Sequence, residues 1–276
     1  MKKTLCLILS VLMLLGMFAG CGKKSGSYVE LEEYFTDEQY GIGFRNEDVA
    51  LGLKVMEILE EMMEDGTAAE ISEKWFGKDV LLKDMDFIEE SEAKADDDSL
   101  QKVLDAGKLV VGGDVYYPPM AFLDGENVIG FDVDLAAEVC ERLGVELVYQ
   151  AIDWDAKEME LNGGNIDCIW NGMTITEERI DSMYFAKAYI ANAQIIIVEE
   201  GAGIEKIADL EGKIVGMQKG SSAVEAFQSN PISEKTKEAV EYADNQAAYL
   251  DLKAGRIDAL VIDSVAGRYM LSTEAE

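Results

Sequence analysis

The sequence predicts an α/β fold. Short apolar runs that suit buried strands alternate with amphipathic stretches that suit helices between residues 100 and 264. Hydrophobic residues make up 49% of the 276 residues, which is enough for a sizeable core in one domain or two lobes. The alternation favours βαβ units on open sheets over a sandwich or a helical bundle.

Charge and composition exclude several classes of function. The formal net charge is −31 and the pI is near 4.2, so polyanions such as nucleic acid or an acidic lipid surface are not expected as partners. The chain contains no histidine, which removes the commonest general base and transition-metal ligand. Glycine-rich phosphate-binding spacings are also missing. We therefore expect no metal, no cofactor and no catalytic residue.

The first 24 residues indicate export. Lys2 and Lys3 precede an apolar stretch that is short for a membrane span, and small residues precede Cys21. The run 18–21 resembles a bacterial lipobox, although the usual Leu is replaced by Phe18. We expect a signal peptide at 1–20, a lipidated Cys21, a polar tether at 21–27 and an extracytoplasmic, membrane-anchored protein. An uncleaved anchor helix is the alternative.

Two cysteines remain after export and lipidation. Cys140 lies in a helix-like stretch and Cys168 in a strand-like one. They could form one disulfide in an exported protein, or they could be two buried thiols. We favour thiols.

Residues 28–82 carry strand, turn and helix signals. The run 40–45 predicts a strand, and an amphipathic helix follows, begun by Asn46 or Asp48 and ended by Gly66. Thr67 is expected to cap a second helix that ends at Gly77, with the adjacent aromatic pair at 75–76 in the core. The acidic run 83–99 lacks an apolar period, which predicts an extended linker or a loosely docked loop.

A regular βα pattern begins at Leu100. Helices are expected at 100–107 and 134–144, and strands at 108–114, 128–134, 145–152, 166–173, 193–200, 213–218 and 258–264. The ends of such strands are where open α/β sheets bind ligands. Polar and aromatic residues at these ends are therefore candidate site residues.

Arg179 is the strongest single candidate. A helix is expected to open at Thr176, with Glu177 and Glu178 in its first turn, where their charges suit the helix dipole. A positive charge there opposes the dipole, so Arg179 either forms a surface salt bridge with Asp181 or a glutamate, or marks a site. A guanidinium fork beside backbone amides suits a carboxylate ligand.

Other candidates follow the remaining strands. Gly220, Ser221 and Ser222 open a helix, where their amides could meet an anion, although a serine cap explains them equally well. Asp263 could cap a helix or receive an ammonium group. The further candidates, which could equally be core residues or turn residues, are Asp114, Tyr117 and Trp154.

Five runs in a fixed order carry a family resemblance: LVVGGDVYYPPMAF (109–122), IGFDVDLAAEVCERLG (129–144), DWDAKEMELNGGNIDCIWNGMTITEER (153–179), ADLEGKIVGMQKGSS (208–222) and KAGRIDALVID (253–263). Each is weak alone. Together they resemble the polar amino-acid solute-binding proteins of bacterial ABC importers, extracellular family 3. The resemblance covers almost all of the chain beyond residue 28. It implies a type II periplasmic-binding-protein-like fold, in which two α/β lobes joined by two crossovers close on a ligand.

The order of the motifs departs from the family. The runs TDEQYGIGFRNED (36–48) and MEDGTAAEISEKWFG (63–77) resemble the end of a family member but stand first here. This predicts a circular permutant, in which the linker 83–99 joins the usual termini and spans up to roughly 50 Å. Lobe 1 would be 41–188, and lobe 2 would be 28–40 plus 189–276. Swapping of 28–82 into a neighbouring molecule, or a remnant that no longer folds, are the alternatives.

The resemblance also implies roles for individual residues. Arg179 and the amides of Thr174 and Ser222 would hold the ligand α-carboxylate, and the Gly172 carbonyl and Asp263 would hold the α-ammonium. Tyr117 and Trp154 would flank the ligand side chain, whose tip would lie near Asp114, Asn171 and Gln218. Met120-Ala121 replaces a frequent Phe-Glu pair, and Gln218 replaces a residue that is charged in some relatives. Glutamine-like, cationic and cystine-like ligands therefore stay open.

The expected function is capture of a polar amino acid and delivery to an ABC-importer permease, by a monomer that closes at hinges near Tyr40 and Tyr189. Two alternatives remain. One is a sensing module that presents its closed form to a separate receptor. The other is a lyase-like enzyme on the same fold with Asp114 or Asp153 as its base, although no paired acid and base stands out.

Overall fold

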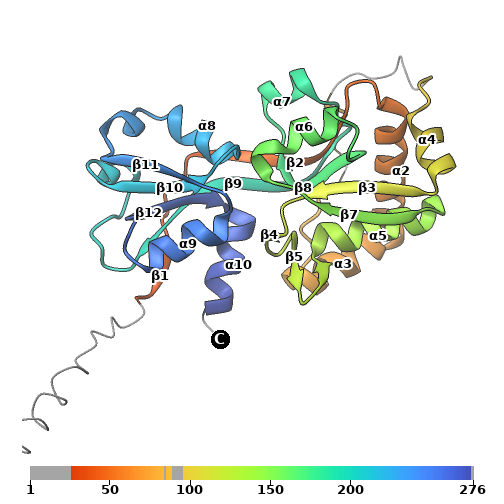
Figure 1. Ribbon diagram of the computed structural model, residues 1–276. Helices are drawn as coiled ribbons and strands as arrows, with labels where there is room; N and C mark the ends of the chain where they lie inside the picture. Colours follow the sequence, from red (N-terminus) through yellow and green to blue (C-terminus); the bar gives the residue numbers. More distant parts are fainter. Residues whose placement is uncertain (1–25, 84, 89–95, 275–276) are drawn as a thin grey trace, which may run out of the picture.

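Figure 1 shows a computed structural model of the chain, which describes residues 26–83, 85–88 and 96–274. The predicted signal peptide, Cys21, most of the tether and part of the acidic linker lie outside these residues. In the described part no helix is both long and apolar enough to cross a bilayer.

The described strands form a long sheet in the order β11-β10-β12-β9-β2-β8-β3-β7, with β1 paired to β9. One half, called here the β3 half, is built on β3 (Lys108–Gly113), β7 (Glu146–Ala151) and β8 (Cys168–Thr174). The other, called the β10 half, is built on β10 (Ile214–Gln218), β11 (Glu238–Tyr242), β12 (Ala259–Asp263) and β1 (Tyr28–Glu30). Figure 1 shows the two halves side by side.

Two long strands join the halves: β2 (Thr36–Phe44) and β9 (Ala188–Glu199). They are antiparallel to each other, and β2 continues along β8 while β9 continues along β12. Within each half the pairs β3 with β7 and β8, and β10 with β11 and β12, are parallel. The predicted α/β class is confirmed. The expected lobe boundaries fall within β2 and at the start of β9.

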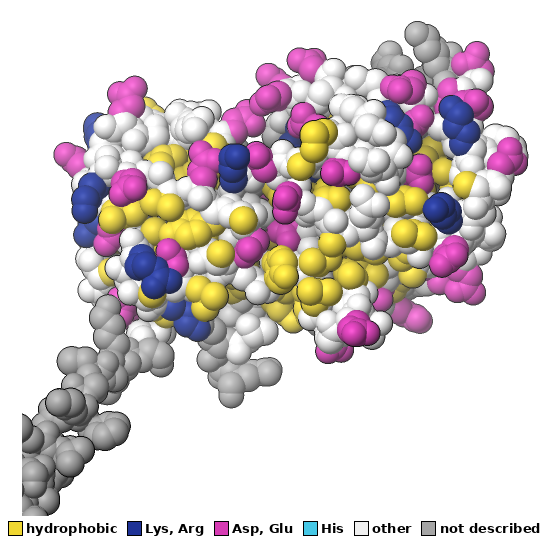
Figure 2. All heavy atoms as spheres, viewed as in Figure 1, with side chains coloured by type: hydrophobic (Ala, Val, Ile, Leu, Met, Phe, Trp, Pro, Cys, Tyr) yellow, Lys and Arg dark blue, Asp and Glu magenta, His cyan; other side chains and the backbone are white. Residues whose placement is uncertain are grey.

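Helices cover both faces of each half. The β3 half carries α2 (Val49–Asp65), α3 (Thr67–Phe76), α4 (Ser99–Ala106), α5 (Phe131–Leu143), α6 (Lys157–Asn162) and α7 (Glu177–Ser182), with the short 3-10 helix η1 (Trp154–Ala156). The β10 half carries α8 (Ser222–Gln228), α9 (Asn245–Lys253), α10 (Ser264–Glu274), η2 (Ile207–Leu210) and η3 (Pro231–Lys235). A small antiparallel sheet, β4 (Tyr116–Tyr117), β5 (Ala121–Asp124) and β6 (Asn127–Ile129), lies at the junction of the halves. Acidic side chains are scattered over the visible surface, as the net charge leads one to expect (Figure 2).

The N-terminal segment packs against the rest of its own chain. Its helix α2 has no side-chain cap from Asp48; instead its amides at Ala50 and Leu51 donate to Asp97 Oδ2 at 2.8 Å and Ser99 Oγ at 3.0 Å. Residues at the end of the linker therefore supply the helix cap. Backbone bonds tie the start of the linker to the β9 region, from Leu82 to Tyr189 at 2.9 Å and from Ile88 to Ala186 at 3.0 Å.

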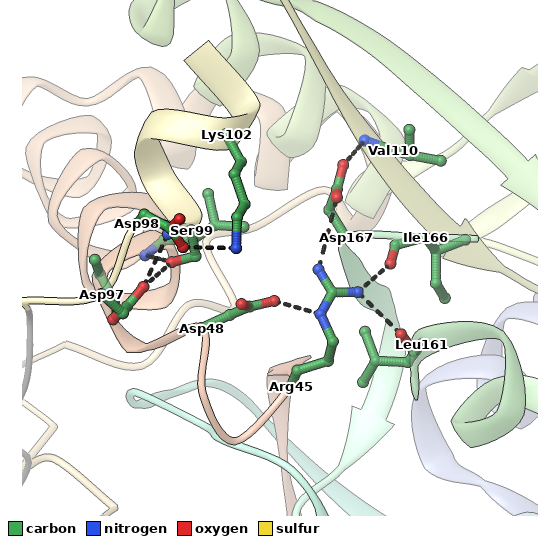
Figure 3. A network of polar contacts seen from close by, with 12 residues as sticks. Arg45, Asp48, Asp97, Asp98, Ser99, Lys102, Val110, Leu161, Ile166 and Asp167 are labelled. Carbon is green, nitrogen blue, oxygen red and sulfur yellow. Dashed lines mark hydrogen bonds and ion pairs between the residues drawn. The ribbon is translucent and has the colours of Figure 1, made fainter. Parts of the chain in front are cut away.

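Figure 3 shows a second tie between early and late segments. Arg45, just after β2, donates through Nη1 to the carbonyls of Leu161 at 2.9 Å and Ile166 at 2.6 Å. Its Nε pairs with Asp48 at 2.5 Å, and Nη2 lies 3.7 Å from Asp167. The Arg45 guanidinium thus holds the end of β2 against the loop between α6 and β8. The strand β8, which follows this loop, carries several candidate site residues.

Two local predictions were wrong. Gly66, with φ +90°, ends α2 and precedes α3, so Thr67 is the first helical residue rather than the cap; its amide donates to Asp65 Oδ1 at 3.0 Å. The strand expected at 128–134 ends at Ile129, and α5 begins at Phe131. The reason is tertiary, because the carbonyl of Pro119 accepts the Phe131 amide at 2.8 Å and so satisfies a first-turn donor of the helix.

Candidate functional site

The sequence-predicted site residues lie around one narrow cavity of about 10 Å³ between the two halves. Its lining is Asp114, Tyr117, Trp154, Asn171, Gly172, Thr174, Arg179, Gln218, Ser221, Ser222 and Asp263. The fold therefore brings together all ten candidate binding residues, from segments that are far apart in the sequence. The charged members of this set are the most informative.

Arg179 is a buried cation that has no carboxylate partner among the described residues. Thr176 caps α7 and accepts the Arg179 amide at 3.3 Å, as the sequence predicts, but the side chain points inward and the residue is only 7% exposed. Its Nη1 donates to the Thr174 carbonyl at 2.7 Å and its Nη2 to the Gly220 carbonyl at 3.2 Å. Among the described residues no carboxylate lies within ion-pairing distance, which excludes the surface salt bridge to Asp181.

Burial of the Arg179 guanidinium lowers its pKa, while the charges of Asp263 and Glu38 act in the opposite direction. A buried charge that has no counter-ion destabilises the folded state by roughly several kcal/mol. The guanidinium borders the cavity, so this position suits an anionic group of a ligand.

Asp263 is the complementary case, a buried carboxylate that has no cationic partner within the part of the chain that the structure describes. It ends β12, and Oδ1 accepts from Tyr40 Oη at 2.9 Å, Asn192 Nδ2 at 2.6 Å and Gln194 Nε2 at 2.9 Å. It is therefore held by the two joining strands and does not act as a simple helix cap. Burial raises the pKa of Asp263 despite these hydrogen bonds. No Lys or Arg in the part of the chain that the structure describes forms an ion pair with it.

Sequence reasoning missed Glu38, on β2. Its Oε2 accepts from Thr174 Oγ1 at 2.8 Å, Ser222 Oγ at 3.2 Å, and the side-chain amides of Asn192 and Gln194, both at 2.9 Å. The same two amides also donate to Asp263, so they bridge the two carboxylates. Burial, and then the charge of Asp263, raise the pKa of Glu38. Strand alternation was the available signal, because Glu38 and the buried Tyr40 share one face of β2.

Asp132 was also missed, and it positions Gly172. Gly172 has φ +56°, and a Cβ there would lie 2.9 Å from the Tyr117 ring, so only glycine fits. Its amide donates to Asp132 Oδ2 at 2.7 Å, and Tyr189 Oη donates to Asp132 Oδ1 at 2.9 Å. Burial raises the pKa of Asp132 to about 7. The glycine in this cavity wall is thus fixed by a carboxylate behind it.

Side chains of both halves also meet at Asp114, which lines the cavity. Gln218 Nε2 donates to Asp114 Oδ2 at 2.9 Å, and Asn171 Oδ1 accepts the Asp114 amide, also at 2.9 Å. Burial, with the charges of Asp244 and Asp153, raises the pKa of Asp114 to about 6 against the opposing bonds from the Tyr116 amide and Gln218. The cavity wall at Asp114 is therefore anionic at neutral pH.

Tyr117, Trp154 and the two serines complete the lining. Tyr117 Oη lies 2.8 Å from Tyr40 Oη, and Trp154 belongs to η1. Ser222 Oγ donates to Thr174 Oγ1 at 3.0 Å, which links the two halves directly. Ser221 is the N-cap residue of α8 but makes no side-chain cap bond; its hydroxyl donates to the Gln218 carbonyl at 2.7 Å.

The cysteines take no part in the cavity. Cys140 and Cys168 are buried free thiols, as favoured from the sequence, and burial raises the pKa of both. In the described residues no cluster of His, Cys, Asp or Glu is arranged to hold a metal ion.

Comparison with known proteins gives a consistent result. Residues 109–253 match the family described as bacterial extracellular solute-binding proteins, family 3. The L-cystine-binding protein TcyJ of Escherichia coli K12 is 34% identical over 175 residues, which cover 62% of this chain and 65% of that protein. The chain therefore spans about 65% of the length of this relative.

Two further similarities concern other amino acids. The lysine/arginine/ornithine-binding periplasmic protein of Escherichia coli K12 is 36% identical over 159 residues, covering 56% of this chain and 60% of that protein. A solved ABC-transporter substrate-binding protein from Streptococcus pneumoniae with bound histidine aligns with a TM-score of 0.62 and 38% identity, covering 64% of this chain and 74% of that one.

Proposed function

Since the chain belongs to family 3 of the bacterial extracellular solute-binding proteins, we propose that it captures a polar α-amino acid between its two halves. The observation that carries this proposal is the pair of unmatched buried charges on one cavity. Arg179 lacks an anion and Asp263 lacks a cation among the described residues, although both line the same space. A zwitterion with one carboxylate and one ammonium supplies both counter-ions at once.

The electrostatics of the cavity favour a basic side chain on that amino acid. Asp114 is ionised at neutral pH, and the charges of Asp244 and Asp153 add to the negative field there. A cationic tip gains from this field and an acidic tip is repelled. The similarity to proteins named for lysine, arginine, ornithine and histidine supports the same choice. Arginine, lysine and histidine are therefore our first candidates, ahead of cystine and glutamine.

Binding would close the molecule. The lining residues come from both halves, so the ligand contacts both and favours the arrangement in which they approach. The joining strands β2 and β9 are where such a hinge motion would occur. We propose that the closed, loaded protein delivers its ligand to an ABC-importer permease, and that a lipidated Cys21 anchors it to a membrane outside the cytoplasm, at the cell surface or in the periplasm. The relatives reported above are named as binding proteins, so an enzyme is the less favoured alternative.

We also propose that the family's motifs are circularly permuted in this chain and that it works as a monomer. The pairing of β1 with β9, the place of β2 between β8 and β9, and the capping of α2 by Asp97 and Ser99 support closure within one chain. Light scattering coupled to size exclusion distinguishes this from swapping of residues 28–82. A folded monomer is expected, whereas an obligate dimer would indicate exchange between chains.

Thermal unfolding tests the function. The purified protein is heated with each common amino acid, or cystine, in excess, because a ligand that binds only the native state raises the Tm. We expect one or more basic amino acids to give the largest rise. A cooperative transition that none of these compounds moves would contradict amino-acid binding and direct attention to catalysis or to sensing of another solute.

A further inference from the structure

A lysine outside the predicted site bridges the two halves. Lys157 is the first residue of α6, in the β3 half, and it is only 4% exposed. Its ammonium donates to the Gly220 carbonyl in the β10 half at 2.9 Å and to the Trp154 carbonyl at 3.3 Å. It also lies 5.1 Å from the centre of the Trp154 ring, within range of a cation–π contact.

Gly220 receives a second donor from the candidate site itself. Arg179 Nη2 also donates to the Gly220 carbonyl, at the longer distance of 3.2 Å. Lys219, next to Gly220 in the same turn, also contacts the opposite half, because its ammonium lies 2.8 Å from Asp155 Oδ2. Gly220 has φ +68°, and a Cβ there would lie 3.0 Å from Asp155 Oδ1. The turn that carries Gln218 and Ser222 into the cavity is thus held from the opposite half.

Lys157 remains charged at neutral pH. Burial, and then the charge of Arg179, lower its pKa to about 8, although Glu158, Asp155 and Glu178 oppose the shift. At pH 7 most molecules therefore carry the ammonium form. Lys157, Arg179 and Gly220 also line a second groove.

The guanidinium of Arg179 carries five N–H donors, and its two carbonyl contacts use two of them. Arg179 therefore keeps donors for a ligand carboxylate while it bonds to Thr174 and Gly220. Its bond to the Gly220 carbonyl is the longer of the two that this oxygen accepts, at 3.2 Å against 2.9 Å from Lys157. Lys157 is therefore the closer donor that holds the Gly220 turn against the β3 half.

We propose that Lys157 is a positioning residue of the amino-acid site, which holds the Gly220 carbonyl across the cleft and so places the turn that carries Gln218 and Ser222 against Arg179. This proposal rests on the proposed function. Its role differs from that of the cavity-lining residues, because Lys157 acts through the Gly220 turn. The effect should therefore appear in ligand affinity and not in the stability of the fold.

The test compares wild type, K157M, K157R and the control K102M by isothermal titration with the amino acid that raises the Tm most. Lys102 is an exposed lysine on α4 that pairs with Asp98. We expect K157M to bind about tenfold more weakly, because the Gly220 turn loses the closer of its two donors from the opposite half. K157R should recover part of the affinity, and K102M should match wild type.

The Tm without ligand is the second readout. Replacing a buried ammonium by a similar apolar chain should leave this Tm unchanged or raise it. Wild-type affinity in K157M, or a loss of affinity matched by a large drop in Tm, would overturn the proposal and leave amino-acid binding intact. If wild type binds no amino acid, the proposed function fails and this inference fails with it.

Discussion

The two walls of the cavity hold their key charges in different ways. Arg179, in the β3 half, bonds to backbone carbonyls of both walls, at Thr174 and Gly220. Asp263, in the β10 half, bonds to side chains of the joining strands β2 and β9. The carboxylate is therefore set in place by the joining strands, whereas one of the two guanidinium contacts, the bond to Gly220, depends on how closely the halves approach. Recognition of the ammonium should be prepared in advance, and recognition of the carboxylate should be coupled in part to closure.

The largest loss of ligand affinity is expected when the Arg179 guanidinium is removed. R179M deletes the guanidinium, so the ligand carboxylate loses its charge-assisted bonds and affinity should fall about a hundredfold or more. The Tm without ligand should hold or rise, because an unpaired buried cation is gone. Isothermal titration and thermal unfolding give the two numbers. A parallel loss of Tm would mean that Arg179 is a structural residue.

The second-largest loss of ligand affinity is expected from a change at Asp263, in the β10 half. D263N keeps the shape of the side chain but removes the charge that faces the ammonium, and we expect about thirtyfold weaker binding. Because burial raises the pKa of Asp263, the wild-type affinity should begin to fall in more weakly acidic solution than an ordinary aspartate would require. The same titration repeated at decreasing pH checks this. A pH-independent affinity would argue against an ionised Asp263 in the complex.

Glu38 accepts hydrogen bonds from Thr174 in the β3 half and Ser222 in the β10 half. Its replacement should reduce ligand affinity less than D263N does. E38Q puts an amide where Thr174, Ser222, Asn192 and Gln194 all donate to a carboxylate, so the network must rearrange. We expect about tenfold weaker binding. The exposed E32Q, on the same segment, is the matched control. Equal affinities for the two variants would remove Glu38 from the site.

The smallest effect on affinity is expected from a change at Asp114. D114N should weaken a basic amino acid more than a neutral one, which a competition titration can measure. It should also change the pH dependence of stability. Burial raises the pKa of Asp114 to about 6, above that of an unfolded chain, so the wild-type free energy of unfolding falls as pH rises from about 4 to about 6. Urea unfolding at these two pH values should show a smaller fall in D114N, and an identical fall would contradict the shift.

Much of the fold was predictable because its signals depend on residues that are close together in the sequence. The alternation of apolar strands with amphipathic helices gave the α/β class, and Thr176 before two glutamates gave the start of α7. The convergence of the candidate residues came from the family resemblance, since no local pattern places Asp114 next to Gln218.

The residues that sequence reasoning missed act through long-range contacts. Asp132 is an ordinary helix residue until Gly172, 40 positions away, donates to it. Asp97 caps a helix amide 47 positions earlier, so the cap of α2 could not be found beside it. Lys157 was not among the predicted site residues, and the structure buries it against Gly220. Such contacts depend on how the halves approach each other.

The central claim, that the cavity binds a zwitterion by its two opposite charges, has a direct test. Isothermal titration is carried out with L-arginine, or with the amino acid that the thermal panel selects, and with two analogues of it. One analogue lacks the α-carboxylate and the other lacks the α-amino group. We predict that the amino acid binds and that each analogue binds about a hundredfold more weakly or not at all. Binding of either analogue as tight as that of the amino acid would contradict the account.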